Sequence, residues 1–235
     1  MRIGFIRESH GQRRPNDVLL RLTLFAASIL IFTVNAEAQN PIPTTETLKK
    51  ANPRPADTKP QPAEPFDGAT VEKMKGQCVT LATENGTIVI EMLPEAAPES
   101  ARNFLNLAAI GALDTTTFSR VVKGFVIQGG NLSTSENWGA ELAARMSRRL
   151  PDEPSDVKHV RGIVSMARPD EPHSATTHFF ILVGNGPHLD GKFAAFGRVI
   201  KGLEVADAIN RAPAENERPV SPVRFKLASV GTCQK

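Results

Sequence analysis

The run Phe118-Ser-Arg-Val-Val-Lys-Gly-Phe-Val-Ile-Gln-Gly-Gly130 constrains the fold of this chain more than any other stretch. Its β-branched and aromatic residues predict two short strands, Phe118–Val122 and Phe125–Gln128, joined by a tight turn. Because side chains alternate between the two faces of a strand, Arg120 and Gln128 stand where apolar residues would normally lie, on faces that they can share. The run therefore predicts a donor-rich, half-apolar surface without a nucleophile or a general base. The alternative is a plain hairpin with one snorkelling arginine.

Strand and helix signals continue on both sides of this hairpin. Asn85-Gly86 predicts a two-residue turn between the first two strands, and Pro98–Ile110 has the apolar spacing of an amphipathic helix that ends at Gly111. Leu203–Ile209 predicts a second, shorter helix. Six further apolar segments are predicted as strands: Val79–Ala82, Thr87–Leu93, Gly162–Met166, His178–Val183, Phe193–Val199 and Val223–Val230. We therefore expect a mainly β fold, a closed eight-stranded antiparallel barrel capped by two α-helices.

The first 38 residues have the pattern of a targeting segment. Five arginines precede the apolar run Leu22–Val34, which spans 13 residues and is shorter than a membrane-crossing helix. Ala36-Glu-Ala38 offers small residues at the spacing of a cleavage site. We expect residues 1–38 to be a signal peptide and the protein to be exported, either periplasmic or secreted. The alternative is an uncleaved leader that anchors the protein in the membrane, facing the periplasm.

The segment that follows the leader is rich in proline, and its charges are balanced. Residues 39–75 carry seven of the 18 prolines of the chain and little that could be buried, so we expect a disordered linker before a folded domain at 76–235. Subtracting the leader's five arginines and three acidic residues from the chain's 28 basic and 25 acidic side chains leaves 23 and 22. A nearly neutral mature chain lacks the basic surface of a nucleic-acid-binding protein.

The two cysteines stand at the two ends of the expected domain. Cys78 opens the first predicted strand and Cys233 follows the last one. In an oxidising compartment a bond between them would close a loop of about 155 residues, which the chain-entropy model values at about 4–5 kcal/mol. Two unpaired cysteines remain the alternative. The chain has no Cys-x-x-Cys motif, which argues against a redox role.

Four runs in a fixed order give the chain a family resemblance. They are Phe118–Gly130, Gly162–Arg168, Thr177–Ile181 and Leu189–Gly197. Together they resemble the cyclophilin family of peptidyl-prolyl cis–trans isomerases over roughly Gly76 to Val230. The pattern is nearest to that of exported bacterial members, in which the strand motif also reads Met-Ala-Arg.

This resemblance implies an enzyme that accelerates X-Pro isomerisation in exported, proline-containing client proteins, without a cofactor or a metal. Arg120 would be the electrostatic catalyst and Gln128 would hold substrate carbonyl or backbone groups. Ala167 and Arg168 would lie along the peptide backbone. The proline pocket would be lined by Phe125, Met166, Phe180, Leu189 and Phe193.

Four positions depart from the pattern of the best-known members. Ser119 replaces a histidine of minor importance, and Phe193 replaces a pocket histidine. His178 stands where a glutamine is usual, which changes a hydrogen bond to the substrate. His188 stands where a tryptophan contributes to cyclosporin binding, so we expect weak cyclosporin binding with catalysis intact.

Other readings of the sequence are weaker. Gly186–Lys192 has the spacing of a P-loop, but Phe193 stands where Ser or Thr must bind Mg²⁺. The histidines fit no metal motif, and Ser165 lies in a strand with no evident base. We expect the protein to be a monomer. The main alternative to the isomerase is a non-catalytic binding module for proline-containing segments. A hydrolase or metalloenzyme on a related barrel is a third hypothesis.

Overall fold

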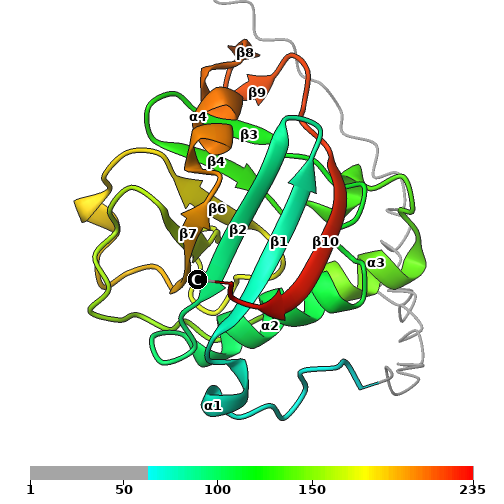
Figure 1. Cartoon of the computed structure of the whole chain (residues 1–235), viewed down its shortest axis with the longest axis vertical. Helices are drawn as coiled ribbons and strands as arrows, with labels where there is room; N and C mark the ends of the chain where they lie inside the picture. The colour runs from blue at the N-terminus through cyan, green and yellow to red at the C-terminus, as the bar shows by residue number, and fades with distance from the viewer. Residues whose placement is uncertain (1–62, 235) are drawn as a thin grey trace, which may run out of the picture. The chain divides into compact units, whose positions relative to one another are not determined.

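Eight antiparallel strands form one curled sheet in the computed structural model, which describes residues 63–234 (Figure 1). Their order across the sheet is β10-β1-β2-β7-β5-β6-β4-β3. The bounds are β1 Gln77–Thr83, β2 Gly86–Met92, β3 Arg120–Val122, β4 Val126–Gly129, β5 Ile163–Met166, β6 Phe179–Leu182, β7 Ala195–Lys201 and β10 Phe225–Thr232. A separate two-stranded hairpin pairs β8 (Ala214–Glu215) with β9 (Arg218–Pro219).

The curled sheet confirms the expected mainly β, eight-stranded antiparallel architecture, and it shows how far the barrel closes. The edge strands β3 and β10 form no ladder with each other. Instead, residues just before them meet at an isolated bridge between Thr117 and Arg224. Two backbone bonds support this bridge: the Phe225 amide donates to the Thr116 carbonyl at 2.8 Å, and the Phe118 amide donates to the Val223 carbonyl at 3.0 Å. The sheet is therefore a half-barrel that closes only at this point.

Two helices lie at opposite ends of the curled sheet, as the sequence predicts (Figure 1). These are α2 (Pro98–Ala109) and α4 (Leu203–Arg211), and the described chain adds the short helices α1 (Val71–Met74) and α3 (Ala140–Met146). Pro98 starts α2 at a position where a missing N–H costs nothing, and Gly111 follows the helix at φ 71°. That left-handed conformation favours glycine and ends the helix.

The inner face of the sheet encloses the main hydrophobic core. Phe104 of α2 contacts Phe179 and Phe196 at ring distances of 4.9 and 5.0 Å. Phe118 contacts Phe225 at 4.7 Å. All five rings are fully buried and belong to one cluster, called the inner cluster below. Each buried ring contributes about 1.5–3 kcal/mol, so this cluster holds the sheet against α2.

The first hairpin forms one residue earlier than the sequence predicts. Thr83 pairs with Gly86, so the turn residues are Glu84 and Asn85, and Gly86 is the first residue of β2. The Thr83 hydroxyl explains the shift, because it donates to the Gly86 carbonyl at 2.7 Å and accepts from the Asn85 amide at 3.1 Å. Local side-chain bonding therefore outweighs the Asn-Gly turn signal here.

The folded unit begins earlier than residue 76, so the expected linker boundary at 75 is wrong for residues 64–75. Glu64 forms a buried ion pair with Arg145, with side-chain exposures of 8% and 4%. The Phe66 amide donates to Asn106 at 2.7 Å, and Met74 of α1 is fully buried in the inner cluster. The ion pair, the hydrogen bond and the buried methionine compensate the entropy of ordering this segment. The predicted signal peptide and the linker up to residue 62 lie outside the described residues.

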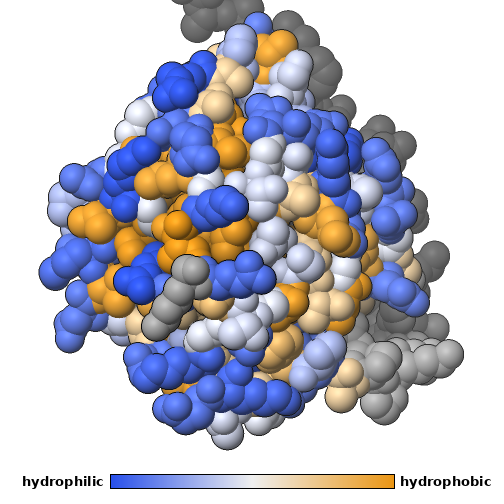
Figure 2. Space-filling view, viewed as in Figure 1, coloured by the Kyte–Doolittle hydropathy of each residue, from blue (hydrophilic) through white to orange (hydrophobic). Residues whose placement is uncertain are grey.

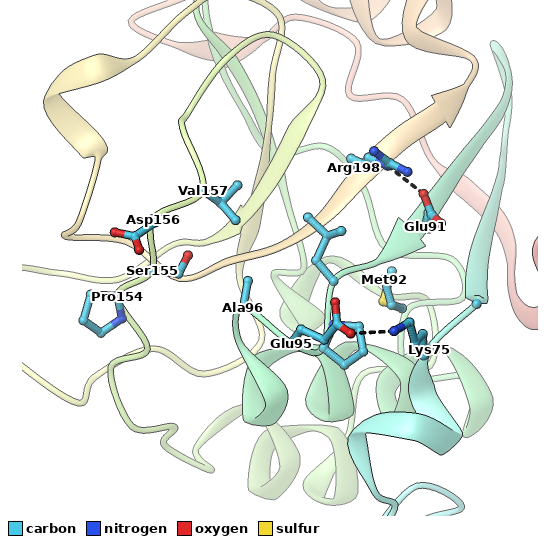
Figure 3. A pocket seen from close by; sticks show the side chains of 13 residues that line it. Lys75, Glu91, Met92, Glu95, Ala96, Pro154, Ser155, Asp156, Val157 and Arg198 are labelled. Atoms are coloured by element: carbon cyan, nitrogen blue, oxygen red, sulfur yellow. Dashed lines mark hydrogen bonds and ion pairs between the residues drawn. The ribbon is translucent and has the colours of Figure 1, made fainter.

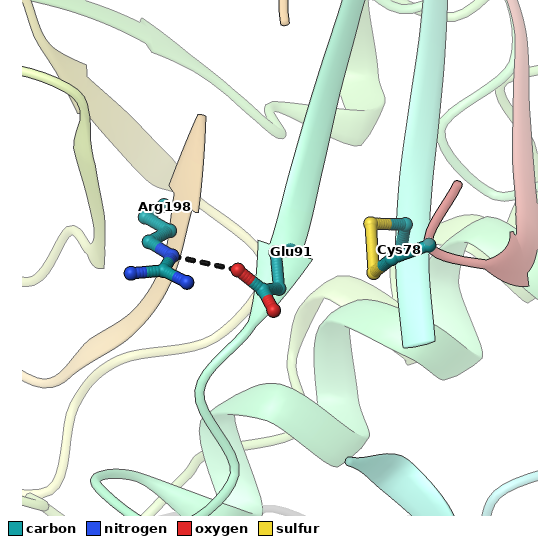
Figure 4. The surroundings of a disulfide bond; sticks show 4 residues. Cys78, Glu91 and Arg198 are labelled. Carbon is teal, nitrogen blue, oxygen red and sulfur yellow. Dashed lines mark hydrogen bonds and ion pairs between the residues drawn. A yellow bond between two sulfur atoms is a disulfide. The ribbon is translucent and has the colours of Figure 1, made fainter. Parts of the chain in front are cut away.

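A disulfide joins Cys78 to Cys233, with α-carbons 5.0 Å apart and a sequence separation of 155 (Figure 4). Cys78 lies in β1 opposite Glu91 of β2, which forms an ion pair with Arg198 at 2.6 Å. The Cys233 amide donates to the Gly76 carbonyl at 2.9 Å. The bond therefore fastens the start of β1 to the residue that follows β10.

Apolar side chains also reach the surface on the face shown in Figure 2, where they gather over β7 and its neighbouring loops between charged groups. Ile200 of β7 is 43% exposed. Within residues 63–234, no helix combines the length and the apolar character that a membrane crossing requires.

Candidate active site

The β3–β4 hairpin brings Arg120 and Gln128 together. The two residues are cross-strand partners, and an Arg120 guanidinium N–H (NH1) donates to Gln128 Oε1 at 3.2 Å. Gly130, just after β4, has a φ of 81°, and a Cβ at this position would lie 2.2 Å from the Thr177 carbonyl oxygen. Only glycine fits this close approach, which lets β4 run beside β6.

A row of paired residues runs from this arginine across the outer face of the sheet. Gln128 pairs with Phe180 of β6, Phe180 pairs with Ser165 of β5, and Ser165 pairs with Ala195 of β7. Because neighbouring strands lie about 4.8 Å apart, the α-carbons of Arg120 and Phe180 are separated by about 10 Å. We call these five residues the outer row. It passes from a cation, through an amide, to an aromatic ring.

A second apolar cluster covers the outer face beside this row. Phe180 and Leu189 are two of its six buried members, with exposures of 6% and 8%, while Phe125, Ala167 and Phe193 are half-buried at its rim. The members of this outer cluster come from five segments of the chain. They are Val122, Phe125, Val126, Val157, Ile163, Ala167, Phe180, Leu182, Leu189, Phe193 and Ala195.

Aromatic contacts shape the rim of the outer cluster. Phe180 and Phe193 meet edge to face, with ring centres 6.0 Å apart. His188 lies 5.4 Å from the ring of Phe125, at an interplanar angle of 34°. The structure therefore brings Phe125, Phe180, Leu189 and Phe193 together as the sequence predicts, with His188 beside them.

Arg168 stacks over this rim. Its guanidinium carbon lies 5.3 Å from the centre of the Phe193 ring, and its Nε forms an ion pair with Asp152 at 3.2 Å. It also donates to the Pro169 carbonyl at 2.9 Å and to the Lys192 carbonyl at 3.3 Å. These contacts tie the loop after β5 to the loop before β7 and fix one wall of the cluster.

Met166 does not line this surface, and its predicted place in the pocket is wrong. It is 2% exposed and belongs to the inner cluster, because β5 turns Val164 and Met166 inward. Val126 of β4 is a buried outer-cluster residue that the sequence analysis missed. Its position two residues before Gln128 is the signal that could have found it, since residues i and i+2 share a face of a strand.

His178 stands at the other side of the Ala167 backbone. It is half-buried, and its carbonyl accepts from the Ala167 amide at 2.9 Å. Burial lowers the pKa of the His178 imidazole, so the ring is neutral at pH 7.

Ser165 does have a base, contrary to the sequence analysis. Its hydroxyl lies 3.0 Å from His159 Nε2, and His159 Nδ1 lies 3.2 Å from Asp190 Oδ1. Burial lowers the pKa of His159 more than the bond to Asp190 raises it. The ring is therefore neutral, Nδ1 donates to the carboxylate, and Nε2 accepts from the serine.

This Ser165–His159–Asp190 chain is not a hydrolase site. Ser165 is 0% exposed and His159 is 1% exposed, so a substrate cannot reach the hydroxyl. The His159 amide also donates to Asp190 at 2.8 Å, and this is the main reason that the pKa of Asp190 is lowered. Asp190 directly follows Leu189, and Ser165 lies in β5. The hydrogen bonds through His159 therefore connect the turn at Leu189 to β5 beneath the outer cluster.

An open hollow of about 790 Å³ lies elsewhere, at the end of β2 (Figure 3). Its charged groups pair with one another: Lys75 with Glu95 and Arg198 with Glu91, both at 2.6 Å. Of the outer-cluster residues, only Val157 lines it, and Arg120 and Gln128 do not. Among the residues that the structure describes, no group of three His, Cys, Asp or Glu side chains is placed to hold a metal ion.

The half-barrel therefore presents an arginine and a glutamine beside an aromatic-lined outer surface. The sequence model of the cyclophilin-type peptidyl-prolyl cis-trans isomerase family matches residues 78–230. The chain therefore belongs to the cyclophilin-type peptidyl-prolyl cis–trans isomerases.

Curated relatives and solved structures agree with this assignment. The chain is 39% identical over 152 residues to mouse peptidyl-prolyl cis-trans isomerase-like 3, covering 63% of this chain and 92% of that protein. It is 37% identical to Arabidopsis thaliana peptidyl-prolyl cis-trans isomerase CYP23, covering 59% of this chain and 62% of the relative, which is less than two thirds of that protein.

A solved structure of a Cryptosporidium parvum cyclophilin-type isomerase matches with a TM-score of 0.60 at 29% identity, covering 67% of this chain and 99% of that one. A second structure of that protein was determined in the presence of the dipeptide Ala-Pro. The relatives named are eukaryotic, so the expected nearness to exported bacterial members does not follow from them.

Proposed function

We propose that this isomerase accelerates the folding of exported, proline-containing proteins by binding the twisted X-Pro amide more tightly than either planar form. The barrier to peptide-bond rotation is about 18–20 kcal/mol, and each 1.36 kcal/mol of preferential binding gives a tenfold rate increase. No covalent step is needed. A donor must face the imide nitrogen as it regains its lone pair, and an apolar surface must hold the ring.

The outer row is the observation that carries this proposal. It places the α-carbons of Arg120 and Phe180 on one face of the sheet, two strand spacings apart, so that a hydrogen-bond donor and an aromatic ring serve the same surface. Both are needed for one proline, because the imide nitrogen is an atom of the pyrrolidine ring. We assign to Arg120 the hydrogen bond to the imide nitrogen, and to Gln128 the grip on a substrate carbonyl. Phe125, Phe180, Leu189 and Phe193 hold the proline ring.

The Ala167–Arg168 segment lies along the substrate backbone in this proposal. Ala167 is at the rim of the outer cluster, next to the stacked pair of Arg168 and Phe193. The neutral His178 ring beside it can accept or donate one hydrogen bond to the peptide, in place of the usual glutamine. His188 supplies a histidine ring where cyclosporin would need an indole, so weak cyclosporin binding is part of the proposal.

The proposal also places the protein outside the cytoplasm, acting as a monomer. The Cys78–Cys233 bond supports export, because disulfides persist in oxidising compartments. The predicted signal peptide supports the same location, with the uncleaved, membrane-anchored form as the alternative. Mass determination of the N-terminus of the protein isolated from cells distinguishes the two forms.

The test is a cis–trans exchange assay on an Ala-Pro tetrapeptide, with the purified chain and its Arg120→Ala variant. Removing one preorganised donor costs about 10²- to 10³-fold in rate. We expect a loss of kcat/KM of this size while the peptide still binds. Equal rates for the two proteins would leave only the alternative, a binding module for proline-containing segments.

A further inference from the structure

The catalytic arginine has a second partner, which comes from the far end of the chain. Arg120 Nε donates to Glu217 Oε2 at 2.8 Å, across a sequence separation of 97 residues. Gln128 accepts from NH1 on the other side of the same guanidinium. Among residues 63–234, the structure gives NH2 no partner. Two acceptors therefore hold one part of the planar group and leave the rest open to the solvent side, where the Arg120 side chain is 45% exposed.

The backbone that carries Glu217 adopts an unfavourable conformation. Asn216 and Glu217 form the turn between β8 and β9, with φ angles of 48° and 65°. Asparagine tolerates this left-handed region, whereas glutamate has no local bond that favours it. Such strain persists where the surrounding structure enforces it, and it clusters at functional sites.

The turn is also docked onto the strand that carries the arginine. The Val121 amide donates to the Glu217 carbonyl at 2.8 Å. The Glu217 backbone is therefore fixed against β3 one residue away from Arg120, and its carboxylate reaches back to the guanidinium. Glu217 thus accepts two hydrogen bonds from β3, one from the Val121 amide and one from the Arg120 side chain.

We propose that Glu217 is a positioning residue for the isomerase reaction: it holds the Arg120 guanidinium in the plane from which its remaining N–H groups meet the twisted imide. An arginine side chain loses substantial rotamer freedom when it is fixed, and a partly exposed one must lose it on substrate binding unless it is already held. Glu217 and Gln128 fix it beforehand. This inference rests on the proposed role of Arg120.

The hairpin provides a matched pair of variants. Glu217→Gly removes the carboxylate and relieves the positive φ, so a purely structural role predicts a protein that is at least as stable and equally active. Asn216→Gly relieves φ at the neighbouring position of the same turn and leaves the carboxylate in place. Glu217→Gln keeps an acceptor oxygen but removes the charge.

We measure kcat and KM by exchange NMR on the Ala-Pro tetrapeptide, with thermal unfolding as the control for folding. Glu217→Gly is expected to lose about threefold to tenfold in kcat, the effect of one hydrogen bond in a solvent-exposed ion pair, with KM within about twofold. Asn216→Gly keeps the wild-type kcat, and Glu217→Gln recovers most of it. In an Arg120→Ala background, Glu217→Gly has no further effect, because the group that it positions is absent.

Three results would overturn the inference. They are a wild-type kcat for Glu217→Gly, an equal loss in Asn216→Gly, and a Glu217→Gln variant as slow as Glu217→Gly. If Arg120→Ala is slow while Glu217→Gly is normal, only the role of Glu217 fails. If Arg120→Ala keeps the wild-type rate, the proposed mechanism fails as well.

Discussion

Replacing Glu64 with glutamine is expected to destabilise the fold by several kcal/mol. The carboxylate accepts from Arg145 Nε at 2.6 Å and from Arg145 NH2 at 3.0 Å, and Arg148 adds a third bond at 3.1 Å. Glutamine keeps the size and one acceptor but removes the charge. The Arg145 guanidinium then stays buried, at 4% side-chain exposure, without a counter-charge.

The expected loss follows from the burial of this pair. Breaking a buried ion pair by removing one partner costs about 3–5 kcal/mol. Burial is the largest influence on the pKa of Arg145 and lowers it, so the site disfavours an unpaired charge. For a domain of this size the loss corresponds to a fall in Tm of about 6–20 °C.

The assay is urea unfolding followed by the fluorescence of Trp138, the only tryptophan of the chain. Glu171→Gln is the matched control, because Glu171 pairs with Arg149 at 2.7 Å with both side chains about 60% exposed, at 61% and 59%. An exposed pair contributes about 0–1 kcal/mol. If Glu64→Gln loses no more than this control, Glu64 is not buried as described and residues 64–75 do not belong to the folded unit.

Three further predictions concern the disulfide, the histidines and the buried serine. Reducing the Cys78–Cys233 bond should lower the free energy of unfolding by about 2–5 kcal/mol, because it frees a loop of 155 residues in the unfolded chain; a loss under 1 kcal/mol contradicts this. The pKa values of His159 and His178 are lowered in the folded protein, so below pH 6.5 the unfolded chain binds more protons than the folded one, and the free energy of unfolding should fall as the pH drops from 7 to 5. His178→Gln should make this dependence of stability on pH weaker, and an unchanged dependence speaks against a lowered pKa for His178. Ser165 should not react with a fluorophosphonate probe, because it is fully buried, and mass spectrometry that finds a labelled Ser165 refutes this.

The part of the site made by one hairpin could be predicted from the sequence. A period of two places Arg120 and Gln128 on one face, and the short turn between their strands fixes the register that pairs them. Phe125 follows from the same run. For this hairpin, local geometry is sufficient.

The alternation of side chains does not predict which residues face inward where a strand is covered on both sides. All four residues of β5 are buried, so polarity does not show which of Ser165 and Met166 faces inward. Met166 was therefore assigned to the wrong face. The His159 partner of Ser165 was missed because it lies in an irregular segment, where no periodicity predicts the direction of a side chain.

Glu217 could not be predicted either, because its bond to Arg120 depends on the docking of a hairpin 97 residues later. Residues 64–75 end a longer stretch, 39–75, whose proline, threonine, alanine and lysine content predicts a linker. Their order comes from a tertiary ion pair to Arg145 and from the burial of Met74, and neither leaves a local pattern.

The Cys78–Cys233 bond has a mechanical consequence. A pulling force applied to the two ends of the chain reaches these two cysteines and then passes through their sulfur atoms. The segment between them, across a sequence separation of 155, then carries no load. In the oxidised protein, pulling on both ends therefore cannot unravel the sheet strand by strand. Only after reduction does tension reach the β1–β10 ladder.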